Sequence, residues 1–175
     1  SLGGIERAMQ EFALGLDKEK FRVLVGAFDP NGPRREIIER HGIPVYKVTA
    51  QTLAGFVRKY KVDIVHAHTI HVKHLIPTVP VIEEAVFSGG YDPTVDINLF
   101  ISTALALKTK QALVREGKEI TYGKDFFVLY YPQNVRAWDG LRLSAAQREL
   151  VRKVWQIAPN DFVICLLYTS PSPRD

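Results

Sequence analysis

The sequence predicts an α/β fold in which helices cover both faces of a parallel sheet. Short apolar runs alternate along the chain with segments whose apolar residues recur at helical spacing. Continuous apolar runs are typical of strands buried on both faces, and their alternation with helices indicates crossover connections between parallel strands. Dense turn chemistry, as at residues 29–33 (DPNGP), separates the elements.

The helices and strands can be placed in order from these patterns. The first helix is predicted over residues 5–16, where one stripe is apolar. Later helices are predicted over residues 34–40, around residues 53–57, after Ser102 as an N-cap, and after the capping box that Ser144 forms with Gln147. The predicted strands span residues 21–27, 43–48, 62–68, 79–82, 95–101 and 126–130.

Composition excludes several functional classes. The chain has 175 residues, 46% of them hydrophobic and 24% charged, which is typical of one globular domain. No apolar run approaches the ~18 residues that span a membrane. The net charge of +4 arises from 23 basic and 19 acidic residues spread along the chain. This balance argues against nucleic acid as a partner but permits contact with an anionic membrane surface.

A glycine pair, Gly3-Gly4, precedes the first predicted helix. Glycines let a ligand approach the backbone, and the free N–H groups of a first helical turn suit a phosphate. The alternative is an ordinary glycine turn before a surface helix. Glu6 favours the helix dipole from the first turn. Neither a G-x-G-x-x-G nor a G-x-x-x-x-G-K-[ST] motif occurs, which counts against dinucleotide binding and nucleotide hydrolysis.

Ligands of parallel α/β sheets bind beyond the carboxyl ends of the strands. This rule brings several segments to one edge of the predicted sheet, where a ligand site is expected. These segments are Gly3-Gly4, residues 26–33, residues 66–71, residues 83–90 and Ser102.

Four histidines, His66, His68, His71 and His74, follow one another at the end of a predicted strand. A metal site needs converging ligands, usually with carboxylate or thiolate support, and the sequence shows no such support beside these imidazoles. We therefore expect no metal. The remaining alternatives are imidazoles that line a ligand cleft and imidazoles that are simply packed or solvated.

Other polar residues at the same edge have simpler interpretations. Glu83 and Glu84 could orient a hydroxyl group or act as a weak base. A charged strand end near solvent is the interpretation that we favour. Ser102 is expected to be a helix N-cap rather than a nucleophile. Asp92 and Asp96 are interpreted as turn and strand-start residues.

An ordered series of motifs resembles the amino-terminal domain of the retaining family 4 glycosyltransferases, which have the GT-B fold. The motifs are GGIERAMQEFALGL, VDIVHAH, PVIEE, DINLFISTALALKTKQAL and VLYYPQNVRAWDG followed by RELVRKVWQIAPNDFVI. The resemblance covers residues 1–164. It implies a Rossmann-like, acceptor-side domain over residues 1–130, without its first strand. Residues 131–164 would then form a crossover, a helix and the first strand of a second domain that is absent.

The resemblance also implies an activity and a set of site residues. The intact enzyme would move a sugar from a nucleotide sugar to a glycan, lipid or small-molecule acceptor. Gly3 and Gly4 would face the donor diphosphate. The acceptor cleft would include His66, His68, Glu83, Glu84 and Ser102. No cofactor other than the donor substrate is implied. The chain alone is expected to be inactive, and the parent enzyme to be cytoplasmic, possibly at the inner face of the plasma membrane.

Two alternatives to the transferase stay open at this point. One is a non-catalytic, Rossmann-like binding module, and the other is a sugar-nucleotide epimerase of GT-B shape. The tail, residues 165–175, resembles read-through of a sequencing adapter and is expected to be non-native. It contains the chain's one cysteine, so the sequence predicts no disulfide.

Overall fold

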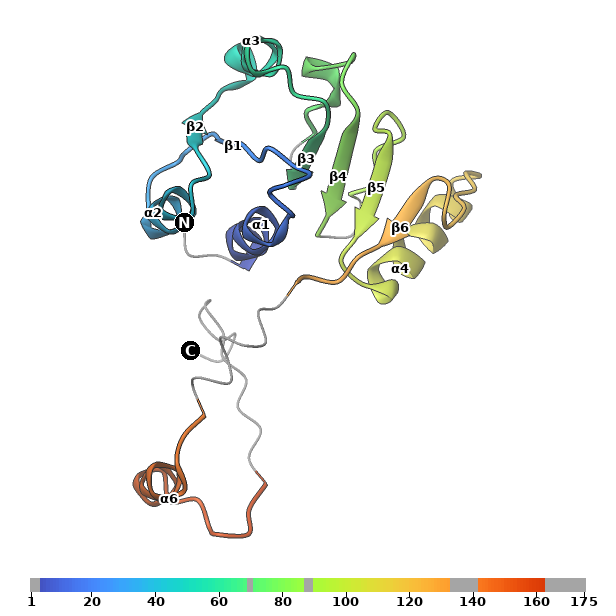
Figure 1. The fold of residues 1–175 in the computed structure, drawn as a ribbon. Coiled ribbons are helices and arrows are strands. Elements are labelled where there is room, and N and C mark those ends of the chain that lie inside the picture. Colours follow the sequence, from blue (N-terminus) through green and yellow to red (C-terminus); the bar gives the residue numbers. More distant parts are fainter. Residues whose placement is uncertain (1–3, 69–70, 87–89, 133–141, 163–175) are drawn as a thin grey trace. The chain divides into compact units, whose positions relative to one another are not determined.

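The computed structural model describes residues 4–68, 71–86, 90–132 and 142–162. The chain divides into two compact units, Ser1–Pro132 and Gln133–Asp175. Figure 1 shows that all the labelled strands belong to the first unit, whereas the second contains helix α6. Within the described residues, no helix is long and apolar enough to cross a membrane.

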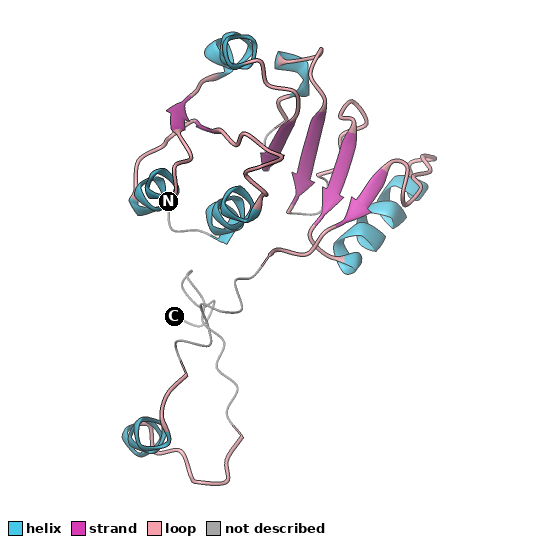
Figure 2. Ribbon diagram, viewed as in Figure 1, coloured by secondary structure: helices cyan, strands magenta, loops and turns pink. Residues whose placement is uncertain are grey.

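Helices and strands alternate through the first unit, as the sequence predicts. The elements are α1 (Gly4–Gly15), β1 (Val25–Ala27), α2 (Pro33–Arg40), β2 (Val45–Lys47), α3 (Ala50–Tyr60), β3 (Val65–His68), the short 3-10 helix η1 (Lys73–Leu75), β4 (Val81–Ala85), β5 (Ile97–Phe100), α4 (Thr103–Arg115) and β6 (Phe126–Val128). Every strand pair is parallel. The predicted α/β class with a Rossmann-like parallel sheet is therefore confirmed (Figure 2).

Helices pack on both faces of the strands. Ala13 of α1 and Ile38 of α2 join one core cluster with β1 and β2. Leu53 of α3 packs instead against Ala67 and Val81 of the neighbouring strands. Phe12 of α1 lies against His66 and His68, the residues on either side of Ala67. Because successive side chains of a strand point to opposite faces, α1 and α3 cover opposite faces of β3.

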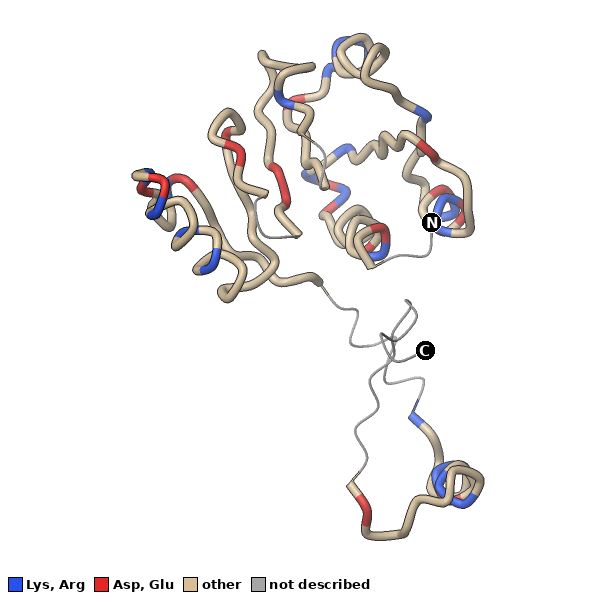
Figure 3. Tube along the Cα trace, turned by 180° about the vertical axis from the view of Figure 1, so that it is seen from behind, with Lys and Arg blue, Asp and Glu red and all other residues tan. Residues whose placement is uncertain are grey.

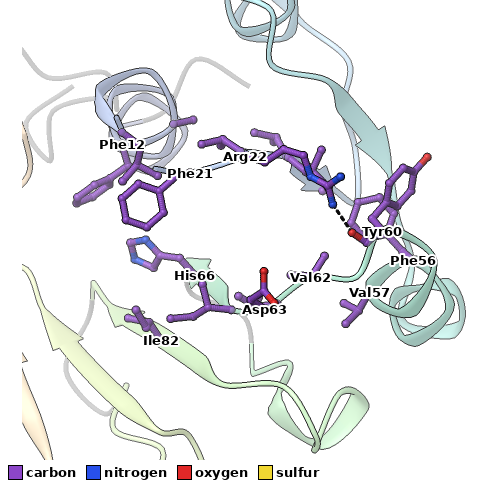
Figure 4. A pocket seen from close by; sticks show the side chains of 18 of the residues that line it. Phe12, Phe21, Arg22, Phe56, Val57, Tyr60, Val62, Asp63, His66 and Ile82 are labelled. Carbon is purple, nitrogen blue, oxygen red and sulfur yellow. Dashed lines mark hydrogen bonds between the residues drawn. The ribbon is translucent and has the colours of Figure 1, made fainter. Parts of the chain in front are cut away.

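The strands form two separate sheets, in the orders β1-β2 and β3-β4-β5-β6. An apolar cavity of about 680 Å³ lies between β1 and β3 and is lined by residues that include Phe12, Val25 and Val65 (Figure 4). A doubly wound sheet with the strand order 3-2-1-4-5-6 has its first strand at this place. The expected absence of a first strand stays a prediction, but the cavity occupies the position of such a strand.

A polar contact closes one end of the cavity. The guanidinium of Arg22 donates a hydrogen bond to the backbone oxygen of Tyr60, at 2.5 Å (Figure 4). This contact links the segment before β1 to the end of α3. It therefore connects the β1-β2 sheet to the sheet that begins with β3. Among the described residues, no strand pairing joins these two sheets.

The two side-chain caps predicted from the sequence are both present, at the starts of α4 and α6. The hydroxyl of Ser102 accepts a hydrogen bond from the backbone N–H of Leu105, at 3.2 Å, at the start of α4. In the second unit, Ser144 and Gln147 form a reciprocal capping box at the start of α6 (Ala145–Val154). The sequence predicts the start of a strand at residues 162–164; Phe162 is described and does not lie in a strand, whereas residues 163–164 and the tail lie outside the described residues.

Charged residues are spread over the helices and loops of both units (Figure 3). Basic and acidic residues alternate on α2, where Arg35 pairs with Glu39 and Arg40 with Glu36. Such exposed pairs contribute little stability, about 0–1 kcal/mol each.

The free strand edges at the cavity predict self-association, because unpaired edges beside apolar surface pair with other chains. Phe21 and Ile64 line the cavity and are about half exposed. We expect sedimentation velocity to show association that increases with concentration. The double variant Phe21→Lys/Ile64→Lys should shift the chain toward monomer. The charge-matched control Leu107→Lys/Val114→Lys, at exposed positions of α4, should not. A wild-type chain that stays monomeric at all concentrations would contradict this prediction.

Loss of the α4 cap should lower stability without disturbing the core. Ser102→Ala removes the acceptor for the Leu105 N–H, and the expected cost is about 1 kcal/mol of unfolding free energy. Urea unfolding followed by circular dichroism measures this cost. Ser102→Thr keeps a capping hydroxyl and should retain most of the stability. Equal losses in both variants would show that the hydroxyl does not act as a cap.

Candidate functional site

Two neighbouring carboxylates, Glu83 and Glu84, are buried in the middle of the four-stranded sheet. Each is only 2% exposed. The prediction that they form a charged strand end near solvent is therefore wrong. Strand β4 has β3 on one side and β5 on the other, so it is a central strand of this sheet. Successive side chains of a strand alternate, and the two carboxylates consequently face opposite sides of the sheet.

Glu84 faces two imidazoles of the adjacent strand β3. Its Oε2 atom lies 3.0 Å from Nδ1 of His68 and 3.4 Å from Nε2 of His66. The parallel register places His68 directly beside Glu84, and His66 shares that face two residues earlier. Burial by itself would raise the pKa of Glu84, but the two imidazoles outweigh it and lower the pKa to about 2. Glu84 is therefore ionised at neutral pH.

An aromatic side chain of α1 covers the imidazoles. The ring of Phe12 lies 5.2 Å from the ring of His66 in an edge-to-face arrangement and 5.9 Å from that of His68. The two imidazole rings are themselves 4.4 Å apart. Phe12 belongs to the apolar stripe that predicts the helix, so the packing of α1 also sets the positions of the imidazoles.

Glu83 faces a second cluster on the other side of the sheet. Its Oε1 atom lies 2.7 Å from Nδ1 of His71, which is also 3.6 Å from Oδ2 of Asp92. Burial raises the pKa of Glu83, with a further contribution from Asp92, and His71 opposes the shift. Burial would also raise the pKa of Asp92, but hydrogen bonds from Thr94 and the nearby His71 lower it. The side chain of His71 is 59% exposed, so solvent reaches this cluster.

Tyr131 joins the Glu84 side of the site from the far end of the first unit. Burial, together with the nearby charge of Glu84, raises the pKa of Tyr131 to about 12. The phenol is therefore protonated at neutral pH and has an O–H group to donate. Sequence analysis assigned no role in the site to Tyr131, because about 47 residues separate it from Glu84 and no motif links them.

The structure supplies the carboxylate support that the sequence did not reveal for the histidines. His66 and His68 meet Glu84, and His71 meets Glu83 and Asp92, whereas no ion pair is found for His74 among the described residues. In each cluster the possible ligand atoms lie within 4.8 Å of one another. The premise that these imidazoles lack acidic partners is wrong. The pairing of β3 with β4 brings His66 and His68 to Glu84, which follows them by 18 and 16 positions in the sequence.

Other predicted site residues have local structural roles. Gly4 begins α1, with Glu6 in its first turn, whereas Gly3 lies outside the described residues. Ser102 is occupied as the cap of α4. Asp96 accepts hydrogen bonds from Nζ of Lys73, at 2.6 Å, and from the backbone N–H of Val81, at 2.8 Å. The contact of Gly3 and Gly4 with a diphosphate stays a prediction.

Comparison with known proteins gives a fold likeness. No family model matches the sequence, and no curated protein matches it. The solved structures that resemble the chain include a glycosyltransferase from Rickettsia africae, with 16% identity and a TM-score of 0.66, over 91% of this chain and 48% of that one. They also include Alr3699/HepE from Anabaena in complex with UDP and glucose, with 16% identity and a TM-score of 0.54, over 89% of this chain and 47% of that one. The chain thus spans about half the length of these structures, and it shares with them an α/β, Rossmann-like fold.

Proposed function

We propose that this chain is the acceptor-side half of a glycosyltransferase that moves a sugar from a nucleotide sugar to a glycan, lipid or small-molecule acceptor. The observation that carries the proposal is the buried, ionised Glu84 with His66 and His68, where β3 and β4 end. In doubly wound folds, this edge is where ligands bind, at the point at which the strand order reverses. The Rickettsia africae glycosyltransferase, whose fold is similar, supports the same assignment.

The two carboxylates are suited to recognise hydroxyl groups of a sugar acceptor. Glu84 stays ionised, so its oxygens accept hydrogen bonds, whereas Glu83 holds its proton more tightly because its pKa is raised. The two carboxylates face opposite sides of the sheet, so each would bind a hydroxyl group within its own cluster. His71 is exposed beside Glu83 and offers an acceptor a polar group that it can reach from solvent.

The donor side of the proposal rests on α1. The first turn of a helix presents free N–H groups and the positive end of its dipole, which suit a diphosphate. HepE was crystallised with UDP and glucose, and this supports a nucleotide diphosphate sugar as the donor here. The resemblance of the motifs further supports membership of family 4 and retention of the anomeric configuration of the sugar. The net charge of +4 supports a parent enzyme that works at an anionic membrane surface.

We further propose that the chain has no transferase activity by itself. It spans about half of each matching structure, and sugar transfer requires groups that stabilise the departing diphosphate. In the proposed parent enzyme, these groups belong mainly to a second domain. The chain would thus contribute the acceptor cleft and one side of the diphosphate site.

Two measurements test the function. Incubation of the purified chain with a panel of UDP- and GDP-sugars and glycan acceptors should give no release of nucleotide above a blank. In saturation-transfer NMR, simple sugars should bind weakly, and Glu83→Gln or Glu84→Gln should weaken binding by about 10-fold, because each removes a buried charged acceptor. Glu39→Gln on α2, whose side chain is 40% exposed, is the matched control and should bind as wild type.

Each measurement also has an outcome that would contradict the proposal. Turnover of a nucleotide sugar by the chain alone would disprove its inactivity. Sugar binding that is absent, or unchanged in both buried-carboxylate variants, would remove the acceptor-site assignment. The binding-module alternative would then gain support.

A further inference from the structure

A buried carboxylate normally has a permanent cation or several well-aligned donors as partners, because an uncompensated buried charge is very costly. Glu84 departs from this pattern. Within the described part of the chain, its ion pairs are with His66 and His68 and with no lysine or arginine. The groups closest to its oxygens there are the nitrogens of these two imidazoles and the phenol of Tyr131, none of which is a permanent cation. The carboxylate of Glu84 and the imidazole nitrogens of His66 and His68 are thus the kinds of group that bind a metal cation.

The spacing of these atoms matches a particular ion. Tetrahedral zinc with bonds of about 2.0–2.1 Å holds neighbouring ligand atoms about 3.3 Å apart. Oε2 of Glu84 lies 3.4 Å from Nε2 of His66 and 3.0 Å from Nδ1 of His68, and all the ligand atoms lie within 4.8 Å of one another. The separations of the three groups are therefore of the size that one bound ion requires.

Accessibility and ligand type support the same ion. His66 and His68 form part of the wall of the cavity between β1 and β3, which gives an ion a path to the site. Neutral imidazole is a good ligand for zinc, and two imidazoles with one carboxylate form a set of three protein ligands that leaves a fourth position open. The hard cations Mg²⁺ and Ca²⁺ prefer sites made of oxygen ligands.

We propose that His66, His68 and Glu84 form a zinc-binding site with an open fourth position. The site links β3 to β4 beneath α1, and its metal binding does not depend on the proposed sugar transfer. The cluster of His71, Glu83 and Asp92 on the other face has a single imidazole, which is mostly exposed, and serves as the internal comparison. The sequence-based expectation of no metal is thereby put to a direct test.

The test uses the full chain with no affinity tag and with Cys165→Ser, since the one cysteine would otherwise offer a thiolate. Isothermal titration calorimetry with Zn²⁺ at neutral pH should show one Zn²⁺ site per chain. Substitution with Co²⁺ should give the visible bands of a tetrahedral ion. Histidine-selective NMR should show Zn²⁺ shifting the ring signals of His66 and His68 before those of His41 and His74.

Variants assign the ligands. Glu84→Gln and His68→Ala should each weaken Zn²⁺ binding by at least about 10-fold, whereas His71→Ala should leave the affinity unchanged. Glu84→Gln preserves the size of the side chain, and the Co²⁺ and NMR measurements on the parent chain provide a readout even if a variant fails to fold. The proposal is overturned by absence of Zn²⁺ binding, by an octahedral Co²⁺ spectrum, or by binding that His71→Ala removes and Glu84→Gln does not.

Discussion

The parallel pairing of β3 with β4 is the interaction on which the candidate site depends. It places His68 beside Glu84 and Ala67 beside Glu83, so each face of the sheet receives its own set of side chains. A slip of one residue would turn every side chain of β3 to the other face and separate the imidazoles from Glu84. The buried charge of Glu84 in turn makes the correct register more favourable, because only that register gives it partners.

The candidate site lies where the order of the strands changes, between β1 and β3. The α1 and α2 helices pack with β1 and β2, while α3 packs on the other face of β3, so the switch of faces lies between β1 and β3. The apolar cavity, the imidazoles and the covering ring of Phe12 all occur there. The same gap that leaves strand edges unpaired therefore gives access to His66 and His68. The proposed acceptor site and the proposed zinc site both depend on this access.

Local patterns predicted most of the secondary structure. Three predicted features depend on residues that are close together in the sequence: the apolar stripe of α1, the N-cap at Ser102 and the capping box at Ser144. Because the interacting residues are neighbours in the sequence, the sequence pattern alone predicts these features. The predicted strands are longer than the observed ones at several ends; residues 21–24, for example, precede β1. Strand ends depend on pairing with a neighbour, and β1 has a partner on one side only.

The sequence alone determined the α/β class, the order of helices and strands, and the edge of the sheet at which the candidate site residues lie, because periodicity and chain direction suffice for these features. Only the tertiary structure decided the environment of the polar residues. The burial of Glu83 and Glu84, their separation onto opposite faces and their pairing with histidines depend on strands that neighbour one another in space. The same holds for Tyr131 beside Glu84. Burial and ionisation are properties of the surroundings, and the surroundings of these residues come from distant parts of the chain.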